Sequence, residues 1–116
     1  KWIPGSPYWT DIDYREAQLD DEQQRQLADF SAILFERLGC RDYARFDFRA
    51  DAQGEIKLLE VNPNPGWCWD GKVNFMARFA GLRYADLLRQ IIEAAQERLA
   101  VPVGAPEPAP TPVGAA

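Results

Sequence analysis

The sequence predicts an α+β domain in which an antiparallel β-hairpin packs against helices. Residues 43–49 alternate between aromatic and charged side chains, which is the period of a half-buried strand. Residues 55–62 are rich in strand-forming residues, and the stretch between the two segments has the composition of a turn. Residues 21–38 and 84–99 repeat apolar side chains at helical spacing, so we expect the hairpin to pack against these two helices.

The turn determines which residues of the hairpin face each other. A turn centred on Gln53–Gly54, with Gly54 at positive φ, pairs residues whose numbers sum to 107. A four-residue loop over 52–55 keeps this register, whereas a three-residue loop shifts it by one. The first register gathers polar side chains on one face, with Arg45 opposite Asn62 and Asp47 opposite Glu60. It gathers apolar side chains on the other face, with Phe46 opposite Val61 and Phe48 opposite Leu59.

The polar face carries an electrostatic conflict. Carboxylates directly opposite each other destabilise a hairpin; at ~5 Å and an effective dielectric of ~20, the repulsion is about 3 kcal/mol. A cation between Asp47 and Glu60 removes this conflict. Together with the amide oxygen of Asn62 they form an all-oxygen ligand set that suits Mg²⁺. The alternative is a solvated polar face on which Arg49 or Lys57 neutralises the acids.

The predicted helix over 21–38 has clear boundaries. Asp20 and Gln23 have the spacing of a capping box, and Gly39 can end the helix. Its apolar stripe consists of Leu27, Phe30, Ile33, Leu34 and Leu38. We expect this helix to serve packing only.

Two further helices follow a rigid turn at 63–66 that contains two prolines. A short helix is expected over 74–80, capped by Asn74 and ended by Gly81. The helix over 84–99 has the strongest amphipathic pattern in the chain. Between the turn and the short helix, Trp67 and Trp69 form either a binding wall or buried packing, and packing is the commoner outcome.

The two ends of the chain show no regular period. Residues 1–19 hold four large aromatic side chains and are interpreted as a lid-like loop or a poorly ordered end. Residues 100–116 hold five of the nine prolines and are predicted to be disordered or polyproline-like. We therefore place the folded part at 1–99. Because the first residue is Lys1 rather than Met, we expect a piece of a longer chain.

Composition excludes several classes of function. A chain of 116 residues supplies one small domain. Its net charge of −5 argues against nucleic acid or an anionic membrane as the main partner. No apolar run reaches the ~18 residues of a membrane span. The two cysteines fit no disulfide framework, so a cytoplasmic location is expected. The chain has no histidine, which excludes Ser-His-Asp and Cys-His catalysis within it.

Residues 38–66, LGCRDYARFDFRADAQGEIKLLEVNPNPG, resemble the C-terminal part of the ATP-grasp domain of the D-alanine–D-alanine ligase family. That family has a helix ending in Leu-Gly, an Arg-x-Asp strand, a strand ending in Glu-x-Asn, and a Pro-Gly turn. The same order occurs here, at the family's interval between Asp and Glu. Lys1-Trp2 and residues 81–95 resemble its Lys-aromatic pair and last helix. The resemblance covers about residues 1–98 and implies the C-terminal portion of an ATP-grasp fold.

The resemblance implies a role for each matching residue. Asp47, Glu60 and Asn62 would hold one or two Mg²⁺ or Mn²⁺ ions that grip the ATP phosphates. Glu60 and Asn62 would thereby also contribute to nucleotide binding, and Lys1 would contact the phosphates. Arg45 and the backbone N–H of Gly66 would stabilise an oxyanion. The implied reaction joins a carboxylate to an amine through an acyl phosphate and releases ADP.

The chain departs from the family in two places. The family's acceptor segment contains a serine that binds a carboxylate, whereas residues 67–74 here contain none; Lys72 is the candidate substitute. The family's N-terminal domain, adenine-binding strands and glycine-rich phosphate loop do not occur in these residues. We therefore expect the fragment alone to be inactive and to require the N-terminal part of its own chain. The alternatives are another ATP-grasp peptide or amide ligase, and a non-catalytic remnant or accessory binding module.

Overall fold

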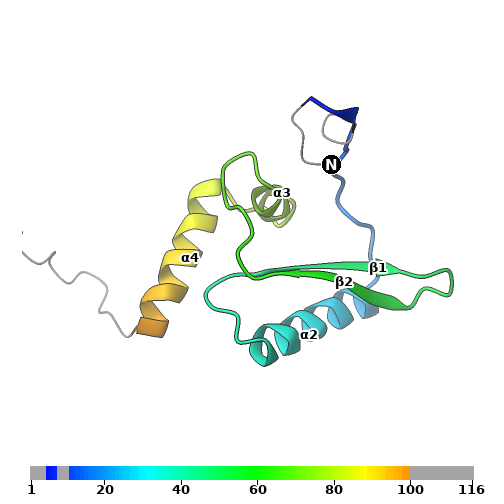
Figure 1. The fold of residues 1–116 in the computed structure, drawn as a ribbon, viewed down its shortest axis with the longest axis horizontal. Coiled ribbons are helices and arrows are strands. Elements are labelled where there is room, and N and C mark those ends of the chain that lie inside the picture. The colour runs from blue at the N-terminus through cyan, green and yellow to red at the C-terminus, as the bar shows by residue number, and fades with distance from the viewer. Residues whose placement is uncertain (1–4, 8–10, 100–116) are drawn as a thin grey trace, which may run out of the picture.

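The computed structural model describes residues 5–7 and 11–99 (Figure 1). Its elements, in chain order, are α2 (Asp21–Arg37), β1 (Arg45–Ala50), β2 (Ile56–Asn62), α3 (Lys72–Phe79) and α4 (Tyr84–Leu99). The two strands form an antiparallel sheet, so the predicted α+β class is confirmed. Lys1 and the predicted disordered tail at 100–116 lie outside the described residues.

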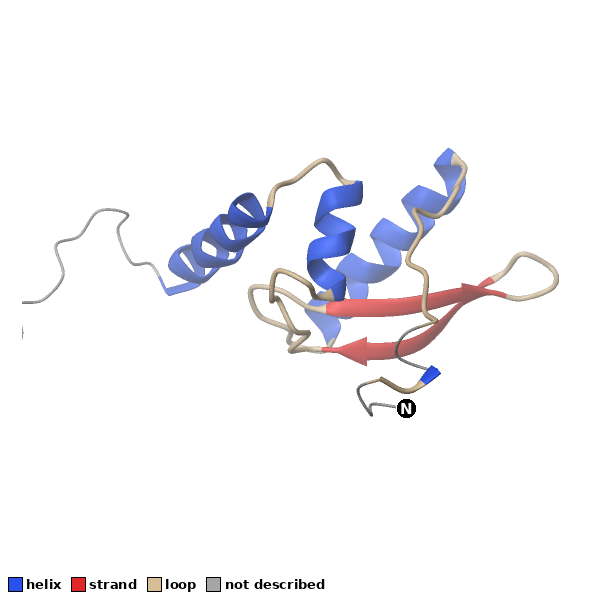
Figure 2. Ribbon diagram, turned by 90° about the horizontal axis from the view of Figure 1, so that it is seen from above, coloured by secondary structure: helices blue, strands red, loops and turns tan. Residues whose placement is uncertain are grey.

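The helices lie on different sides of the hairpin. Figure 1 shows α2 along one face of the two strands and α3 on the side of the opposite face. The predicted packing of a helix under the hairpin is therefore confirmed for α2. The expectation that α4 also packs on the sheet is wrong: α4 contacts α3 and lies beyond the end of the strands in both views (Figures 1 and 2). The face of the hairpin opposite α2 is therefore not covered by α4.

The predicted register is correct only for the half of the hairpin that carries the polar residues. Arg45 pairs with Asn62, Phe46 with Val61, and Asp47 with Glu60. Beyond Asp47 the pairing shifts by one, so Phe48 faces Leu58 and not Leu59 as expected. Leu59 is the extra residue of a β-bulge and is 62% exposed.

The turn explains the bulge. The Asp51 N–H donates to the Glu55 carbonyl at 2.9 Å, which closes a loop of three residues, 52–54. The positive φ predicted for Gly54 is confirmed at +85°, but the predicted loop of two or four residues is wrong. A three-residue loop shifts the register by one, and the bulge at Leu59 shifts it back before Glu60. The bulge therefore restores Glu60 to its place opposite Asp47.

The helix ends show one correct prediction and one error. In α2 the Gln23 N–H donates to Asp20 Oδ1 at 2.8 Å, and the Asp20 N–H donates to Gln23 Oε1 at 3.1 Å, so the capping box is confirmed. The predicted cap of α3 is wrong. This helix begins two residues earlier than expected, at Lys72 after Gly71, and Asn74 lies buried within its first turn.

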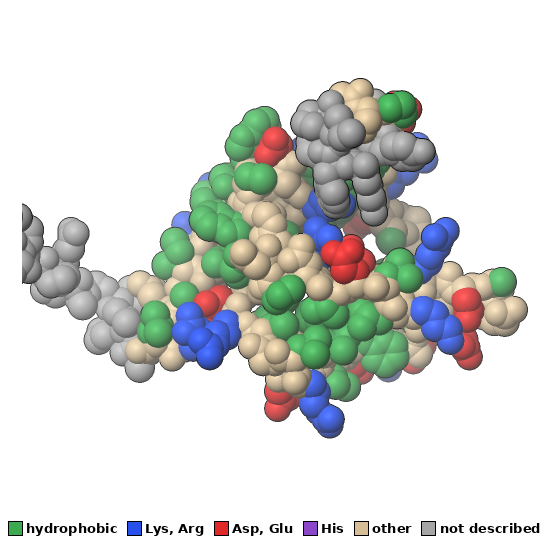
Figure 3. All heavy atoms as spheres, viewed as in Figure 1, with side chains coloured by type: hydrophobic (Ala, Val, Ile, Leu, Met, Phe, Trp, Pro, Cys, Tyr) green, Lys and Arg blue, Asp and Glu red, His purple; other side chains and the backbone are tan. Residues whose placement is uncertain are grey.

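Few apolar side chains are fully buried. Among the described residues, Pro65 is completely enclosed, Ala77 and Leu87 are buried, and no side chain of α2 is. Figure 3 shows a broad apolar area between the hairpin and α2 that is open on the side facing the viewer. The exposed members of the predicted α2 stripe are Phe30, Ile33 and Leu38, at 39%, 53% and 55%. None of the helices that the structure describes is long and apolar enough to cross a membrane.

Candidate metal and nucleotide site

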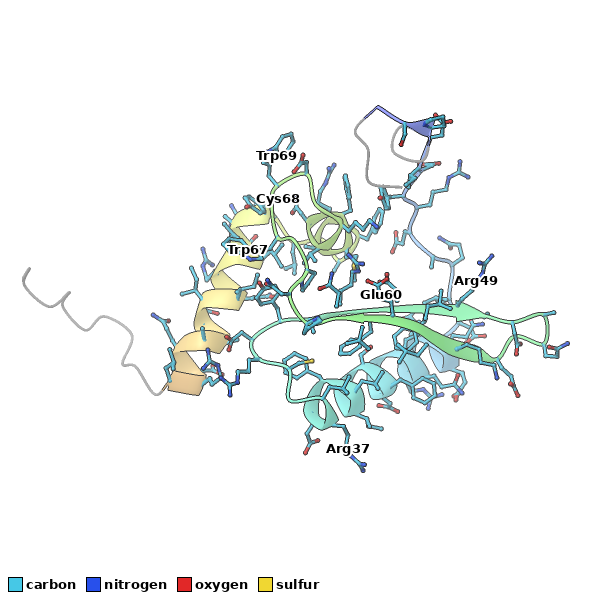
Figure 4. All side chains as sticks on the ribbon, viewed as in Figure 1. Arg37, Arg49, Glu60, Trp67, Cys68 and Trp69 are labelled. Atoms are coloured by element: carbon cyan, nitrogen blue, oxygen red, sulfur yellow. The ribbon has the colours of Figure 1, made fainter. Side chains whose placement is uncertain are left out.

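The polar face of the hairpin brings together the four residues selected from the sequence. The register places Arg45 opposite Asn62 and Asp47 opposite Glu60 on neighbouring strands. Figure 4 shows Glu60 and Arg49 on the side of the hairpin away from α2. The Glu60 side chain is 61% exposed and the Asp47 side chain is 40% exposed. Both carboxylates are therefore accessible to a ligand from solvent.

The cation between the acids is an arginine of the same face. Arg45 donates from Nε to Asp47 Oδ1 at 2.8 Å and from Nη2 to Asp47 Oδ2 at 3.1 Å. Its Nη2 also lies 3.9 Å from Glu60 Oε1. The Arg45 side chain is only 13% exposed. The guanidinium thus offsets the repulsion that the register creates, by a two-pronged pair that suits a carboxylate.

The alternative interpretation assigned the neutralisation of the two acids to Arg49 or Lys57, whereas the structure assigns it to Arg45. Lys57 Nζ lies close to Glu55 and 3.6 Å from Asp51 Oδ2, at the turn. Residues two apart in a strand share a face, so the spacing allows Arg45 and Arg49 equally to pair with Asp47, and the structure shows that Arg45 does so.

Asn62 takes part in the turn that follows the hairpin. Its Oδ1 accepts a hydrogen bond from the Asn64 N–H at 3.0 Å, and Asn64 Oδ1 in turn accepts one from the Tyr43 hydroxyl at 2.6 Å. An amide oxygen has two lone pairs, so Asn62 Oδ1 keeps one for a further ligand. The network holds the Asn62 side chain at the end of β2.

The donor set of this face fits Mg²⁺. Asp47 and Glu60 supply two carboxylates, Asn62 supplies an amide oxygen, and Mg²⁺ commonly binds one or two carboxylates together with substrate phosphates. Within the described ranges, no group of three or more His, Cys, Asp and Glu side chains is placed to hold a metal ion. A metal held by this set would keep its remaining positions for water or phosphate oxygens.

Residues 67–71 form the tryptophan loop, which lies between the turn after the hairpin and α3 and is closely packed around Gly71. A Cβ at Gly71 would meet the carbonyl oxygens of Gly66 and Cys68 and the Cys68 Sγ, each at 3.1 Å, whereas a Cβ at Gly66 would meet nothing within 4 Å. The loop nevertheless exposes Trp67 by 45% and Trp69 by 71%. The commoner outcome for such a cluster, buried packing, is wrong here. Figure 4 shows Trp69 pointing away from Glu60.

Lys72 lies next to the aromatic ring of Tyr14. It is the first residue of α3, half-buried, and its Nζ lies 5.9 Å from the centroid of the Tyr14 ring. Tyr14 also stacks on Phe75 of α3, with ring centroids 5.2 Å apart. The predicted lid-like segment therefore touches α3 through Tyr14, and its role as a lid stays a prediction.

Asn74 is a residue whose importance the sequence analysis missed. The residue is 5% exposed, and its Nδ2 donates a short hydrogen bond to the Trp69 carbonyl. The bond fixes the tryptophan loop to the first turn of α3. Its sequence signal was ambiguous because Asn is common at helix caps, which is the role we assigned to it.

Comparison with known proteins agrees with this geometry. The D-ala D-ala ligase C-terminus family matches residues 9–93, which is most of the chain. The chain belongs to this family. The matched range contains both strands, α2, α3 and the turn that carries Gly66. The resemblance inferred from the sequence is therefore confirmed.

Individual relatives are similar to this chain over about 80 residues. The chain is 34% identical over 84 residues to a D-alanine–D-alanine ligase of Pelotomaculum thermopropionicum, a match covering 72% of this chain and 26% of the relative. It is 38% identical over 84 residues to D-alanine–D-alanine ligase B of Pseudomonas syringae, with coverage of 72% and 26%. A third relative, the protein y4sG of Sinorhizobium fredii, is 34% identical over 82 residues, with coverage of 71% and 24%. The chain thus spans about a quarter of the length of these relatives.

Proposed function

We propose that this chain is the C-terminal part of an ATP-dependent, ADP-forming carboxylate–amine ligase of the D-alanine–D-alanine type. The observation that carries the proposal is the polar face of the hairpin, where Asp47, Glu60 and Asn62 lie together beside Arg45. Membership of the D-ala D-ala ligase C-terminus family supports the reaction class. The names of the ligase relatives support the same class.

The proposed chemistry has two steps. A carboxylate oxygen of the first substrate attacks the γ-phosphorus of ATP, and ADP leaves. The nitrogen of an amine then attacks the acyl carbon, loses a proton, and expels inorganic phosphate as the amide bond forms. Water would hydrolyse the acyl phosphate, so a segment that covers the site is needed. Residues 11–19, held to α3 by Tyr14, are the candidate cover.

Each site residue has a proposed role. Asp47, Glu60 and Asn62 would hold one or two Mg²⁺ or Mn²⁺ ions. When bound, the metal would neutralise negative charge on the ATP phosphates as phosphoryl transfer develops. Arg45 and the backbone N–H of Gly66 would stabilise the oxyanion formed when the amine attacks. Lys1, which lies outside the described residues, would contact the phosphates.

The tryptophan loop is the proposed determinant of the amine substrate. The loop has no serine, and Gly71 leaves no room for a side chain without movement of its neighbours. Lys72 would hold an acceptor carboxylate as a point charge. These differences favour an acceptor other than D-alanine, although the carboxylate–amine chemistry stays the same.

The remaining partners follow from the short span of the chain. The chain covers about a quarter of its relatives, and the apolar stripe of α2 is partly open. We propose that the N-terminal part of the longer protein covers this surface and supplies the adenine and ribose sites. Nucleic acid and membranes are not proposed as partners, and the proposed location is the cytoplasm.

A screen for ADP formation tests the proposal. The longer protein is incubated with ATP, Mg²⁺ and pairs of small carboxylates and amines, beginning with D-alanine and extending to other amino acids. We expect ADP and phosphate to form in equal amounts and only with a suitable pair. The 1–116 chain alone serves as the control and should release no ADP. ADP formation by the chain alone would contradict the need for the N-terminal part, and no turnover by the longer protein with any pair would contradict the ligase assignment.

A further inference from the structure

Arg45 contacts the two carboxylates that would hold the proposed metal. Both oxygens of Asp47 accept hydrogen bonds from this one guanidinium, at 2.8 and 3.1 Å. The same guanidinium lies 3.9 Å from Glu60 and is largely buried, at 13% exposed. It therefore lies close to both carboxylates that a divalent cation on this face would use.

Two cations cannot use Asp47 in the same way. Each Asp47 oxygen accepts one hydrogen bond from Arg45 and keeps a second lone pair, so the conflict is electrostatic: the positive charges of the metal and the guanidinium repel each other at such short range. Binding of the metal therefore favours departure of Arg45 from Asp47. Without the metal, the arginine pair offsets the repulsion between Asp47 and Glu60.

We propose that Arg45 is an internal counter-ion that a divalent cation displaces from Asp47. This inference rests on the proposed metal site. Displacement frees the Arg45 guanidinium only when the metal is loaded. Arg45 would then be available to a developing oxyanion after the metal and its phosphates are in place. Metal binding and the release of Arg45 would occur together. Arg45 would therefore become available for the attack of the amine only after the metal needed for phosphoryl transfer has bound.

The hairpin supplies its own control residue. Arg49 lies two residues after Asp47, as Arg45 lies two residues before it, so all three side chains share one face of β1. Arg49 pairs with Lys57 in the half of the hairpin between the bulge and the turn. Arg45 lies in the other half, together with Asp47 and Glu60. The two arginines match in charge and in spacing but differ in the pair that they form.

The direct test observes the Arg45 Nε–H group during a metal titration. The 1–116 chain is labelled with ¹⁵N-arginine, its Arg45 signal is assigned with Arg45→Lys, and Mg²⁺ is added across the millimolar range. The amide signals of Asp47 and Glu60 report metal binding. We expect the Arg45 Nε–H signal to shift and to exchange faster with water as Mg²⁺ binds, while the Arg49 signal changes little. An Arg45 signal that stays constant while the backbone of Asp47 and Glu60 responds would overturn the inference but leave the metal site intact. No response anywhere on the hairpin would contradict the metal site itself.

A second test measures the affinity for Mn²⁺ alone by electron paramagnetic resonance of the free ion. Arg45→Met should tighten Mn²⁺ binding by about tenfold, because the competing charge-assisted pair is gone. Arg49→Met should change the affinity by less than about twofold, because its charge is not paired with Asp47. An equal rise in Mn²⁺ affinity in both variants would show a general effect of positive charge and would overturn the proposal that the metal displaces Arg45. Circular dichroism of each variant checks that the fold is retained, and the wild-type titration stands if Arg45→Met does not fold.

Discussion

Arg98, near the end of α4, donates hydrogen bonds from Nε and Nη2 to the two carboxylate oxygens of Asp42, both at 2.8 Å. Asp42 lies in the loop before β1 and has φ +63°, a conformation that is uncommon for a residue with a side chain. Its side chain is 15% exposed. Because α4 lies beyond the end of the strands, this pair ties the last helix to the loop that leads into the hairpin.

We expect Arg98→Met to lower the thermal midpoint of the chain by several degrees. The substitution removes both hydrogen bonds and leaves the shielded Asp42 carboxylate without its partner. Arg25→Met is the matched control, because Arg25 forms a local and exposed pair with Glu22 within α2. Such pairs contribute little, so the control should shift the midpoint by about one degree or less. Equal shifts in the two variants would contradict a linking role for the Arg98 pair.

Acid should destabilise the chain through Asp42 and Asp86. The hydrogen bond from Arg98 lowers the pKa of Asp42, and the hydrogen bond from Arg83 lowers the pKa of Asp86 to about 2. An unfolded Asp has a pKa of about 3.9, so the unfolded chain binds more protons between these values. The stability that these acids contribute is present above about pH 4 and is lost as the pH falls toward 2.

Thermal midpoints measured from about pH 6 to pH 2 check this dependence. Asp86→Asn and Arg83→Met should each make the acid-side decrease shallower, because each removes the charged pair whose two side-chain hydrogen bonds join Arg83 to Asp86. An unchanged decrease in both variants would contradict the assignment to this pair.

Gly71→Ala should disturb the tryptophan loop. The new methyl group would lie 3.1 Å from two carbonyl oxygens and from Cys68 Sγ, so the loop must move by a few tenths of an ångström, at a cost of about 1 kcal/mol. Gly66→Ala is the control, because nothing lies within 4 Å of its new methyl group. We expect tryptophan emission and acrylamide quenching to change in Gly71→Ala only. Identical spectra for all three proteins would show that the loop is looser than its packing indicates.

The sequence was sufficient to predict the elements and the residues of the polar face. Alternation at 43–49 and the helical spacing at 84–99 are local signals, and the structure has a strand and a helix at those places. The pairing of Asp47 with Glu60 was correct although the assumed loop was wrong. A three-residue loop and the bulge at Leu59 shift the register in opposite directions, and the two shifts cancel.

Other features depend on contacts between distant segments and could not be predicted. The choice of Arg45 over Arg49 as the partner of Asp47 has no signal in the spacing, because both arginines lie two residues from Asp47 on β1. Asn74 had the local signature of a cap, but its burial and its bond to Trp69 depend on how the loop folds back. The link from Arg98 to Asp42 joins residues 56 positions apart and has no local signal.

The central claim is that Asp47 and Glu60 hold the metal through which the longer protein uses ATP. Its most direct test is Mg²⁺-dependent ADP formation by the longer protein carrying Asp47→Asn or Glu60→Gln, with circular dichroism to check the fold. Glu55→Gln is the control, because Glu55 is an exposed acid at the turn of the same hairpin. We predict that each site variant loses about a hundredfold or more in rate, while Glu55→Gln keeps the wild-type rate. Wild-type rates of ADP formation in both site variants would contradict the claim.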